Sequence, residues 1–111
     1  MVKVHIPIKL PSLLNSRMNW RKMLRLKKGQ REETWYALRE EVIPSPPLVV
    51  TITRYGPRQL DDDNLAASCK YVRDEIARKV GVDDGSTLYL WQYRQGIGKY
   101  GVDVEIRQRQ A

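Results

Sequence analysis

The sequence predicts a single α+β domain, residues 1–111, in which helices pack on one mixed β-sheet. Three observations predict this class. Alternating polar and apolar residues near both ends of the chain are typical of half-buried strands, a β-branched run in the middle is typical of a central strand, and two helical patterns separate these strands. The expected order of elements is β-α-β-α-β-β. A chain of 111 residues has room for one modest core.

The first half of the chain predicts one strand and one long helix. Apolar residues alternate with polar ones over residues 2–8, and Pro11 ends this strand. A helical pattern follows over residues 17–42, and we expect Gly29 to break or bend it, because glycine inside a helix costs about 1 kcal/mol relative to alanine. The apolar positions of this helix that we expect in the core are Trp20, Leu24, Trp35, Leu38 and Val42.

The second half predicts a strand, a helix and a hairpin. Residues 48–55 are rich in β-branched side chains and predict a central strand. A helix is expected over residues 63–80, with Gly81 at the position of a C-terminal cap. Strands over residues 87–95 and 102–107 are joined by a glycine-rich turn. The apolar stripe of the helix consists of Leu65, Cys69, Val72, Ile76 and Val80.

Composition limits the class of protein. The net charge of +7 favours a polyanionic partner, with nucleic acid as the first candidate. The single Cys69 excludes an internal disulfide and fits a reducing cytoplasm, and with the single His5 it makes a zinc site or a Ser-His triad hard to assemble. No apolar run approaches the roughly 20 residues that span a bilayer. We therefore expect a cytoplasmic protein with no membrane partner.

Five of the 13 acidic residues flank the helix predicted over residues 63–80, as Asp61–Asp63 before it and Asp83–Asp84 after it. One interpretation is helix capping by Asp62, Asp63 or Asn64. Capping accounts for one or two of these carboxylates, but it does not predict the second pair. The other interpretation is a Mg²⁺ site, since Mg²⁺ prefers hard oxygen ligands.

The metal interpretation makes a geometric demand. Asp61 and Asp63 are two apart in an extended segment and project to the same side. Asp83 and Asp84 reach that side only if the strand that follows them lies beside the strand over residues 48–55. A calcium-binding EF-hand is excluded, because the sixth loop position is not glycine and the twelfth is Val72. The residues alone leave capping and metal binding open.

Several motifs together resemble the RusA family of bacterial and phage Holliday junction resolvases. That family carries an Asp-x-Asp-Asn motif entering a helix, a lysine on that helix, and an aspartate pair before the next strand. The resemblance covers nearly the whole chain and is densest over residues 60–84. The matching residues are Leu60–Leu65, Lys70, Asp74, Gly81–Asp84, Pro11 and Ser12 with Asn15, Trp91, Tyr93 and Gly101–Ile106.

The resemblance implies a RusA-like fold and the roles of particular residues. Asp61, Asp63 and Asp84 would be catalytic metal-binding carboxylates, with Asp83 as a neighbouring ligand. The family's lysine position is Ala67 here, so Lys70, seven residues after Asp63, would take that role. The alternative for Lys70 is a solvated side chain paired with Asp74.

The implied activity is Mg²⁺-dependent cutting of four-way or other branched DNA by a homodimer. Mn²⁺ would be a substitute ion, and no small-molecule cofactor is expected. A prokaryotic or phage-encoded protein associated with the nucleoid is implied. The alternatives are a non-catalytic module that binds branched DNA, and a basic scaffold protein whose aspartates cap a helix.

A basic segment supports a DNA partner. Residues 17–31 contain seven basic residues and no acidic one, whereas solvated helix faces usually mix charges. Tryptophans are more often core than base-stacking residues, so we expect no binding role for them. The residues expected to contact DNA phosphates are Arg17, Arg21, Arg25 and Lys28 on the first helix, and Arg54 and Arg58 beside the acidic cluster.

Overall fold

The fold is known from a computed structural model, which describes residues 1–13, 17 and 19–110. In this part of the chain the order of elements is β-α-β-α-α-β-β, so the second predicted helix is divided in two. The elements are β1 (Val2–Ile6), α1 (Trp20–Leu38), β2 (Leu48–Gly56), α2 (Asp62–Ser68), α3 (Lys70–Val80), β3 (Tyr89–Ile97) and β4 (Gly101–Gln108).

The four strands form one mixed sheet, as predicted, in the order β1-β4-β2-β3. β4 pairs antiparallel with both β1 and β2, whereas β2 and β3 are parallel. Parallel neighbours need a crossover connection, and α2 and α3 supply it. The strand after the second aspartate pair therefore lies beside β2, which confirms the arrangement that the metal interpretation requires.

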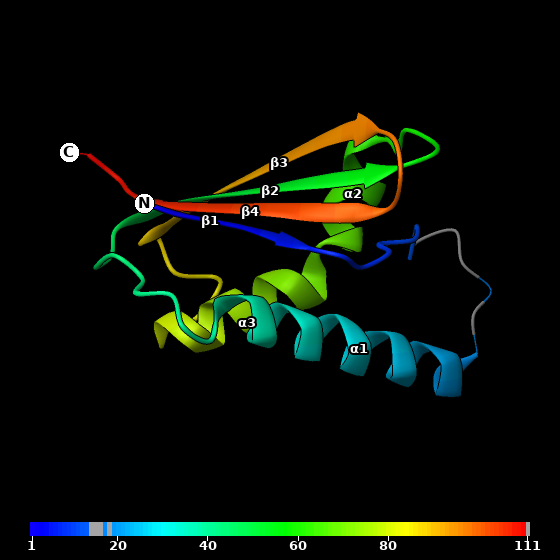
Figure 1. Ribbon diagram of the computed structural model, residues 1–111, viewed down its shortest axis with the longest axis horizontal. Coiled ribbons are helices and arrows are strands. Elements are labelled where there is room, and N and C mark those ends of the chain that lie inside the picture. Colours follow the sequence, from blue (N-terminus) through cyan, green and yellow to red (C-terminus); the bar gives the residue numbers. More distant parts are fainter. Residues whose placement is uncertain (14–16, 18, 111) are drawn as a thin grey trace.

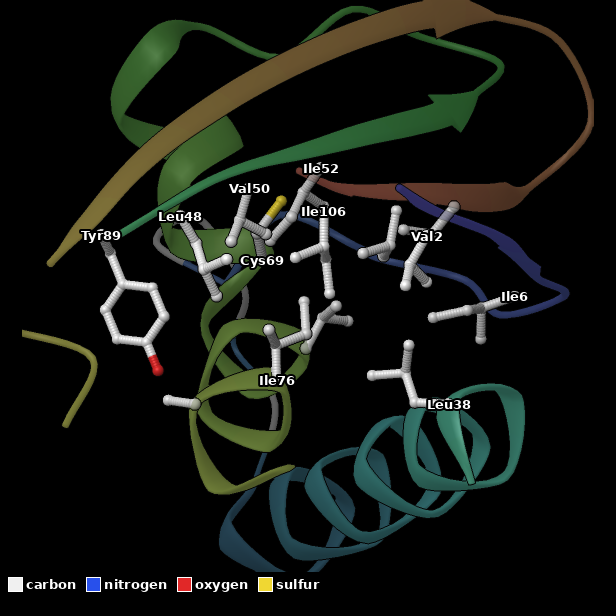
Figure 2. Packing of buried hydrophobic residues seen from close by; sticks show 14 of the residues in the cluster. Val2, Ile6, Leu38, Leu48, Val50, Ile52, Cys69, Ile76, Tyr89 and Ile106 are labelled. Atoms are coloured by element: carbon white, nitrogen blue, oxygen red, sulfur yellow. The ribbon is translucent and has the colours of Figure 1, made fainter. Parts of the chain in front are cut away.

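The helices cover one face of the sheet (Figure 1). The core lies between that face and the helices, and Figure 2 shows Ile52 and Ile106 of the sheet pointing toward Ile76 of α3 and Leu38 of α1. Each of these side chains is fully or almost fully buried. Burial of one such side chain contributes about 1.5–3 kcal/mol relative to leaving it in water.

Helix α1 differs most from its prediction. It spans Trp20–Leu38 rather than residues 17–42, and it continues through Gly29 without a break. Asn19 caps its start by accepting a 2.9 Å hydrogen bond from the backbone N–H of Lys22. Packing of α1 against the rest of the protein offsets the modest free-energy cost of one internal glycine.

The core positions assigned to this helix were mostly wrong. Leu38 is buried as expected, but the buried face is completed by Thr34 and Gln30, one and two turns earlier. The Gln30 side-chain amide donates to the carbonyl oxygen of Lys9, and the Thr34 hydroxyl donates to that of Gln30. The Oε1 atom of Gln30 is buried without a hydrogen-bond partner among the described residues. The predicted core residues that are exposed instead are Trp20, Leu24, Trp35 and Val42.

The predicted helix over residues 63–80 is interrupted at Cys69. The N–H of Cys69 donates to the carbonyl oxygens of Ala66 and Ala67, which closes a tight turn and ends α2. Its apolar stripe is nevertheless buried from Leu65 through Ile76. Gly81 adopts a left-handed conformation, φ 84°, as predicted for the C-terminal cap of α3. None of the helices described here is long and apolar enough to cross a membrane.

Candidate functional site

Asp61 caps the start of α2. Its Oδ1 accepts a 2.8 Å hydrogen bond from the backbone N–H of Asn64, and the Asn64 side-chain amide donates to both carboxylate oxygens at 3.0 Å. These bonds, the backbone one first, hold the pKa of Asp61 below its ordinary value. The capping interpretation is thus correct for one aspartate, but the cap is Asp61 and not Asp62, Asp63 or Asn64.

Asn64 links this carboxylate to the segment after β1. The Ser12 hydroxyl donates a 2.6 Å hydrogen bond to Oδ1 of Asn64, across 52 positions of sequence. Asn64 is buried, so its amide is held between Ser12 and Asp61. Two motif segments that the resemblance uses are therefore in contact. Asn15, which belongs to the same resemblance, lies outside the described residues.

The loop that carries Asp61 is fixed at two further places. Gln95 of β3 accepts from the backbone N–H of Leu60 at 2.9 Å and donates to its carbonyl oxygen at 2.7 Å. Arg54 donates to the carbonyl oxygens of Leu10 and Arg58, at 2.8 and 3.0 Å. Arg54 is only 3% exposed. Its expected role as a phosphate contact was therefore wrong, because its guanidinium is buried and binds the carbonyl oxygens of the two loops.

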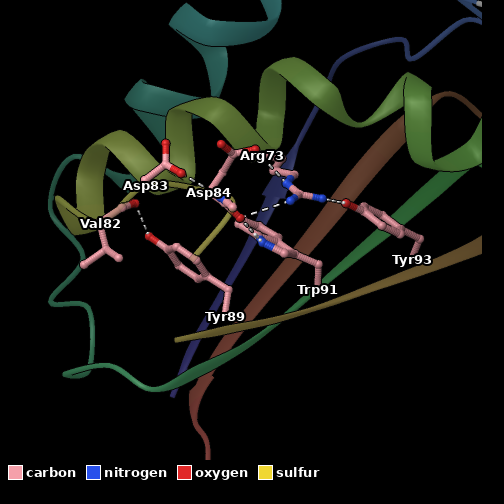
Figure 3. Close-up of polar contacts among 8 residues, drawn as sticks. Arg73, Val82, Asp83, Asp84, Tyr89, Trp91 and Tyr93 are labelled. Carbon is pink, nitrogen blue, oxygen red and sulfur yellow. Dashed lines mark hydrogen bonds and ion pairs between the residues drawn. The ribbon is translucent and has the colours of Figure 1, made fainter. Parts of the chain in front are cut away.

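The second aspartate pair has a different environment, shown in Figure 3. The Arg73 Nε donates to Oδ2 of Asp84 at 3.0 Å, and its Nη2 donates to the Asp84 carbonyl oxygen at 3.0 Å. The indole N–H of Trp91 donates to the same carbonyl oxygen at 2.9 Å. Asp83 is exposed and accepts from the backbone N–H of Gly85 at 3.1 Å. Asp84 is thus tied to α3 and to the start of β3.

Arg73 is the centre of this network, and the sequence reasoning missed it. Its Nη1 donates to the Tyr93 hydroxyl at 2.7 Å, and its guanidinium lies 4.7 Å from the centroid of the Trp91 ring. Burial raises the pKa of the Tyr93 hydroxyl, although its bond to Arg73 opposes this. Nothing in the local sequence distinguishes Arg73 from the other basic residues of α3.

The loop that carries Asp61 and the loop that carries Asp84 are anchored to β3 at different points. Leu60 is held by Gln95, whereas Asp84 is held by Trp91, four residues earlier on the strand. Four residues of strand span about 13 Å. Oxygens that share one Mg²⁺ lie about 2.1 Å from the ion, so they are no more than about 4 Å apart. Within the described part of the chain, no three His, Cys, Asp or Glu side chains form a group that could hold a metal ion.

Asp61 and Asp63 are the acidic residues whose chemistry suits Mg²⁺ best. Both are exposed at the start of α2, as is Asp62 between them. The extended segment that was expected to align them ends at Asp61, because α2 begins at Asp62 and residues two apart on a helix do not face each other. Mg²⁺ is commonly held by one or two carboxylates and completed by water and phosphate oxygens, so each of these exposed side chains still offers a ligand of the right chemistry. The wider set that includes Asp83 and Asp84 is not gathered around one point in this single chain.

Lys70 is the first residue of α3 and is exposed. Lys70 and Asp63 do not lie on one continuous helix, as the predicted helix over residues 63–80 implied, because the turn at Cys69 separates α2 from α3. An ion pair with Asp74 is not present among the described residues either. Lys70 is therefore free of a structural partner in the part of the chain that is described.

The remaining basic residues differ in how available they are. Arg31 is bound to Glu75 of α3 at 3.0 Å, and the Glu75 side chain is only 4% exposed, so this pair is structural. Lys28 makes a loose, solvent-exposed contact of 3.9 Å with Glu32. The residues predicted to bind phosphates that are exposed are Arg17, Arg21, Arg25, Lys28 and Arg58.

A scan of the sequence against models of protein families found no match, and a search of curated proteins found no significant match.

Proposed function

We propose that this protein is a Mg²⁺-dependent, structure-selective endodeoxyribonuclease that resolves Holliday junctions by paired nicks. The observation that carries this proposal is the contact series from Ser12 through Asn64 to Asp61. It joins two motif segments of the resemblance at one exposed carboxylate.

A helix cap alone does not require this arrangement. The backbone N–H of Asn64 is satisfied by Asp61 without any help from Ser12 or Gln95. The additional contacts hold the Asn64 amide and both polar backbone groups of Leu60. Functional carboxylates need such supporting hydrogen bonds to keep their orientation, and the outer partners of metal ligands are worth 10–100-fold in affinity or activity, as an order of magnitude.

In this proposal Asp61 and Asp63 would hold Mg²⁺. The bound ion would polarise the scissile phosphate and lower the pKa of a coordinated water molecule. Asn64 orients the Asp61 carboxylate, and the hydrogen bonds to Asp61 keep it ionised. Arg58, exposed on the same loop, and Lys70, exposed at the start of α3, supply positive charge toward the DNA backbone. Asp84 and Asp83 are not part of this proposed site, because Arg73, Trp91 and Gly85 hold them elsewhere.

Paired nicking calls for two copies of the site. A two-fold homodimer presents two equivalent sites, and a four-way junction has strands related by the same symmetry. A homodimer is therefore part of the proposal.

A second candidate is a module that binds branched DNA without cutting it. The observation that favours it is the engagement of Asp84 by Arg73, which leaves only two of the three expected catalytic carboxylates, Asp61 and Asp63, at the proposed site. The basic surface of α1 serves either function.

The experiment is a cleavage assay on a synthetic four-way junction with the full chain, with Mg²⁺ or with a chelator. We expect nicks only with Mg²⁺. Asp63→Asn should bind the junction and fail to cut it, whereas Asp62→Asn, at the exposed neighbouring position, should cut normally. Junction binding without metal-dependent cutting would support the second candidate. Absent or salt-insensitive DNA binding would contradict both.

A further inference from the structure

The first turns of α1 extend beyond the helix that packs beside it. The Lys27 ammonium lies 5.9 Å from the centroid of the Tyr71 ring, so residue 27 of α1 is level with the start of α3. Trp20 lies seven residues earlier, about 10 Å further along the helix axis. Figure 1 shows this end of α1 reaching past the start of α3.

Two large apolar side chains stand on this extension. Trp20 is 68% exposed and Leu24 is 54% exposed. They are one turn apart and therefore neighbours on the same side of the helix. The Arg21 guanidinium lies 5.3 Å from the centroid of the Trp20 ring. Neither side chain belongs to the described core, so both are available to a partner.

The charge around this pair selects the kind of partner. Residues 17–31 carry seven basic side chains and no acidic one. A second copy docking through the same surface would bring like charges together, which disfavours self-association there. A polyanion with flat apolar groups matches both the charge and the exposed indole.

We propose that Trp20 and Leu24 form a stacking platform for an unstacked base of a nucleic acid, with Arg21, Arg25 and Lys28 holding the adjoining phosphates. This inference rests on the proposed function only in taking DNA as the substrate. Aromatic side chains stack on any base, because every base has a π-face. The bases of an uninterrupted duplex are already stacked on one another. Trp20 would therefore favour branch points and single strands over continuous duplex.

The test is binding of the full chain to three labelled DNAs in chelator, measured by fluorescence anisotropy. These are a four-way junction, a single strand and a duplex of the same arm sequence. Trp20→Ala should weaken binding to the first two by about 5- to 150-fold and leave duplex binding within about twofold. Trp20→Phe should recover part of the loss, since the phenyl ring still stacks.

The chain offers a matched control. Trp35 is 57% exposed on the same helix but lies outside the basic segment, so Trp35→Ala should not change binding to any of the DNAs. Trp20 is the first residue of α1 and is exposed, so its variants should keep the helical circular dichroism and the melting temperature of the wild type. Arg25→Ala should weaken all three complexes alike and reduce their salt dependence.

Several results would overturn the platform. One is equal weakening of junction and duplex by Trp20→Ala, and another is an equal effect of Trp35→Ala. A third is self-association, seen by sedimentation, that Trp20→Ala abolishes. The endonuclease proposal can fail separately. If preferential binding of the junction over duplex depends on Trp20 but no Mg²⁺-dependent cutting occurs, the endonuclease proposal is wrong and the platform stands. If Trp20→Ala cuts and binds the junction normally, the platform is wrong and the endonuclease proposal stands.

Discussion

The Ser12 hydroxyl donates a 2.6 Å hydrogen bond to the side-chain oxygen of Asn64, and this bond ties the segment after β1 to the start of α2. Ser12→Ala removes the donor and leaves a buried acceptor without its partner. We expect the free energy of unfolding to fall by about 1–3 kcal/mol, measured by urea denaturation. Cleavage should fall by about 10-fold or more, because Asn64 orients Asp61.

Ser45→Ala is the control for this change, since Ser45 is exposed in the connector before β2. It should alter neither unfolding nor cleavage. A Ser12→Ala variant that loses stability but cuts at the wild-type rate would show that the bond is structural and has no part in positioning Asp61.

The contact between Arg73 and Asp84 predicts an energetic coupling. Arg73→Gln and Asp84→Asn each break the same side-chain contact, so their effects on the free energy of unfolding should not add. A double-mutant cycle should give a coupling of about 1–3 kcal/mol. The exposed pair of Lys28 and Glu32, at 3.9 Å, is the comparison and should give about 0.5 kcal/mol or less. Equal couplings for the two pairs would contradict the network seen here.

The strands and the cap at Gly81 could be predicted because their signals are local. Alternation along a strand fixes which side chains face the core, and in β4 Val102, Val104 and Ile106 are buried whereas the residues between them are not. A glycine at the end of a helical pattern is suited to the left-handed conformation that Gly81 adopts.

What the sequence could not reveal depends on contacts between distant segments. The buried face of α1 contains Gln30 because the carbonyl oxygen of Lys9 lies within its reach. Arg54 is buried because two loop carbonyl oxygens meet there. The partner of Asp84 is likewise set by the packing of α3 against β3, through Arg73. No spacing rule along the chain encodes these pairings.

The observed orientation of α1 predicts that two leucines of this helix contribute very differently to stability. Leu38 is 1% exposed, whereas Leu24 is largely exposed. Leu38→Ala should lower the free energy of unfolding by about 2–5 kcal/mol, because it removes buried surface and leaves a cavity. Leu24→Ala should stay within about 0.5 kcal/mol of the wild type. Chemical denaturation measures both, and similar losses for the two would mean that α1 packs through its other face.

The buried thiol predicts low reactivity. Burial raises the pKa of the Cys69 thiol to about 11, because the thiolate is poorly solvated there. The thiolate is the reactive form, so at pH 8 only about one molecule in a thousand carries it. Alkylation of the native protein by iodoacetamide should be at least about 100-fold slower than in guanidinium, where the ordinary pKa returns. Mass spectrometry follows the rate, and equal rates would show that Cys69 is accessible.

The hydrogen bonds of Asp61 predict how stability changes in acid. They lower its pKa below the ordinary value of 3.8, so the folded state favours the carboxylate. The stabilisation is therefore fully present above the unfolded-state pKa and is lost as the pH falls through the lower folded-state value. Asp61→Asn cannot ionise, so its stability difference from the wild type should be constant near neutrality and narrow as the pH falls below about 4. Urea denaturation across this pH range measures the difference, with Asp62→Asn as the control. A gap that stays constant into strong acid would mean that the Asp61 carboxylate gains nothing from Asn64.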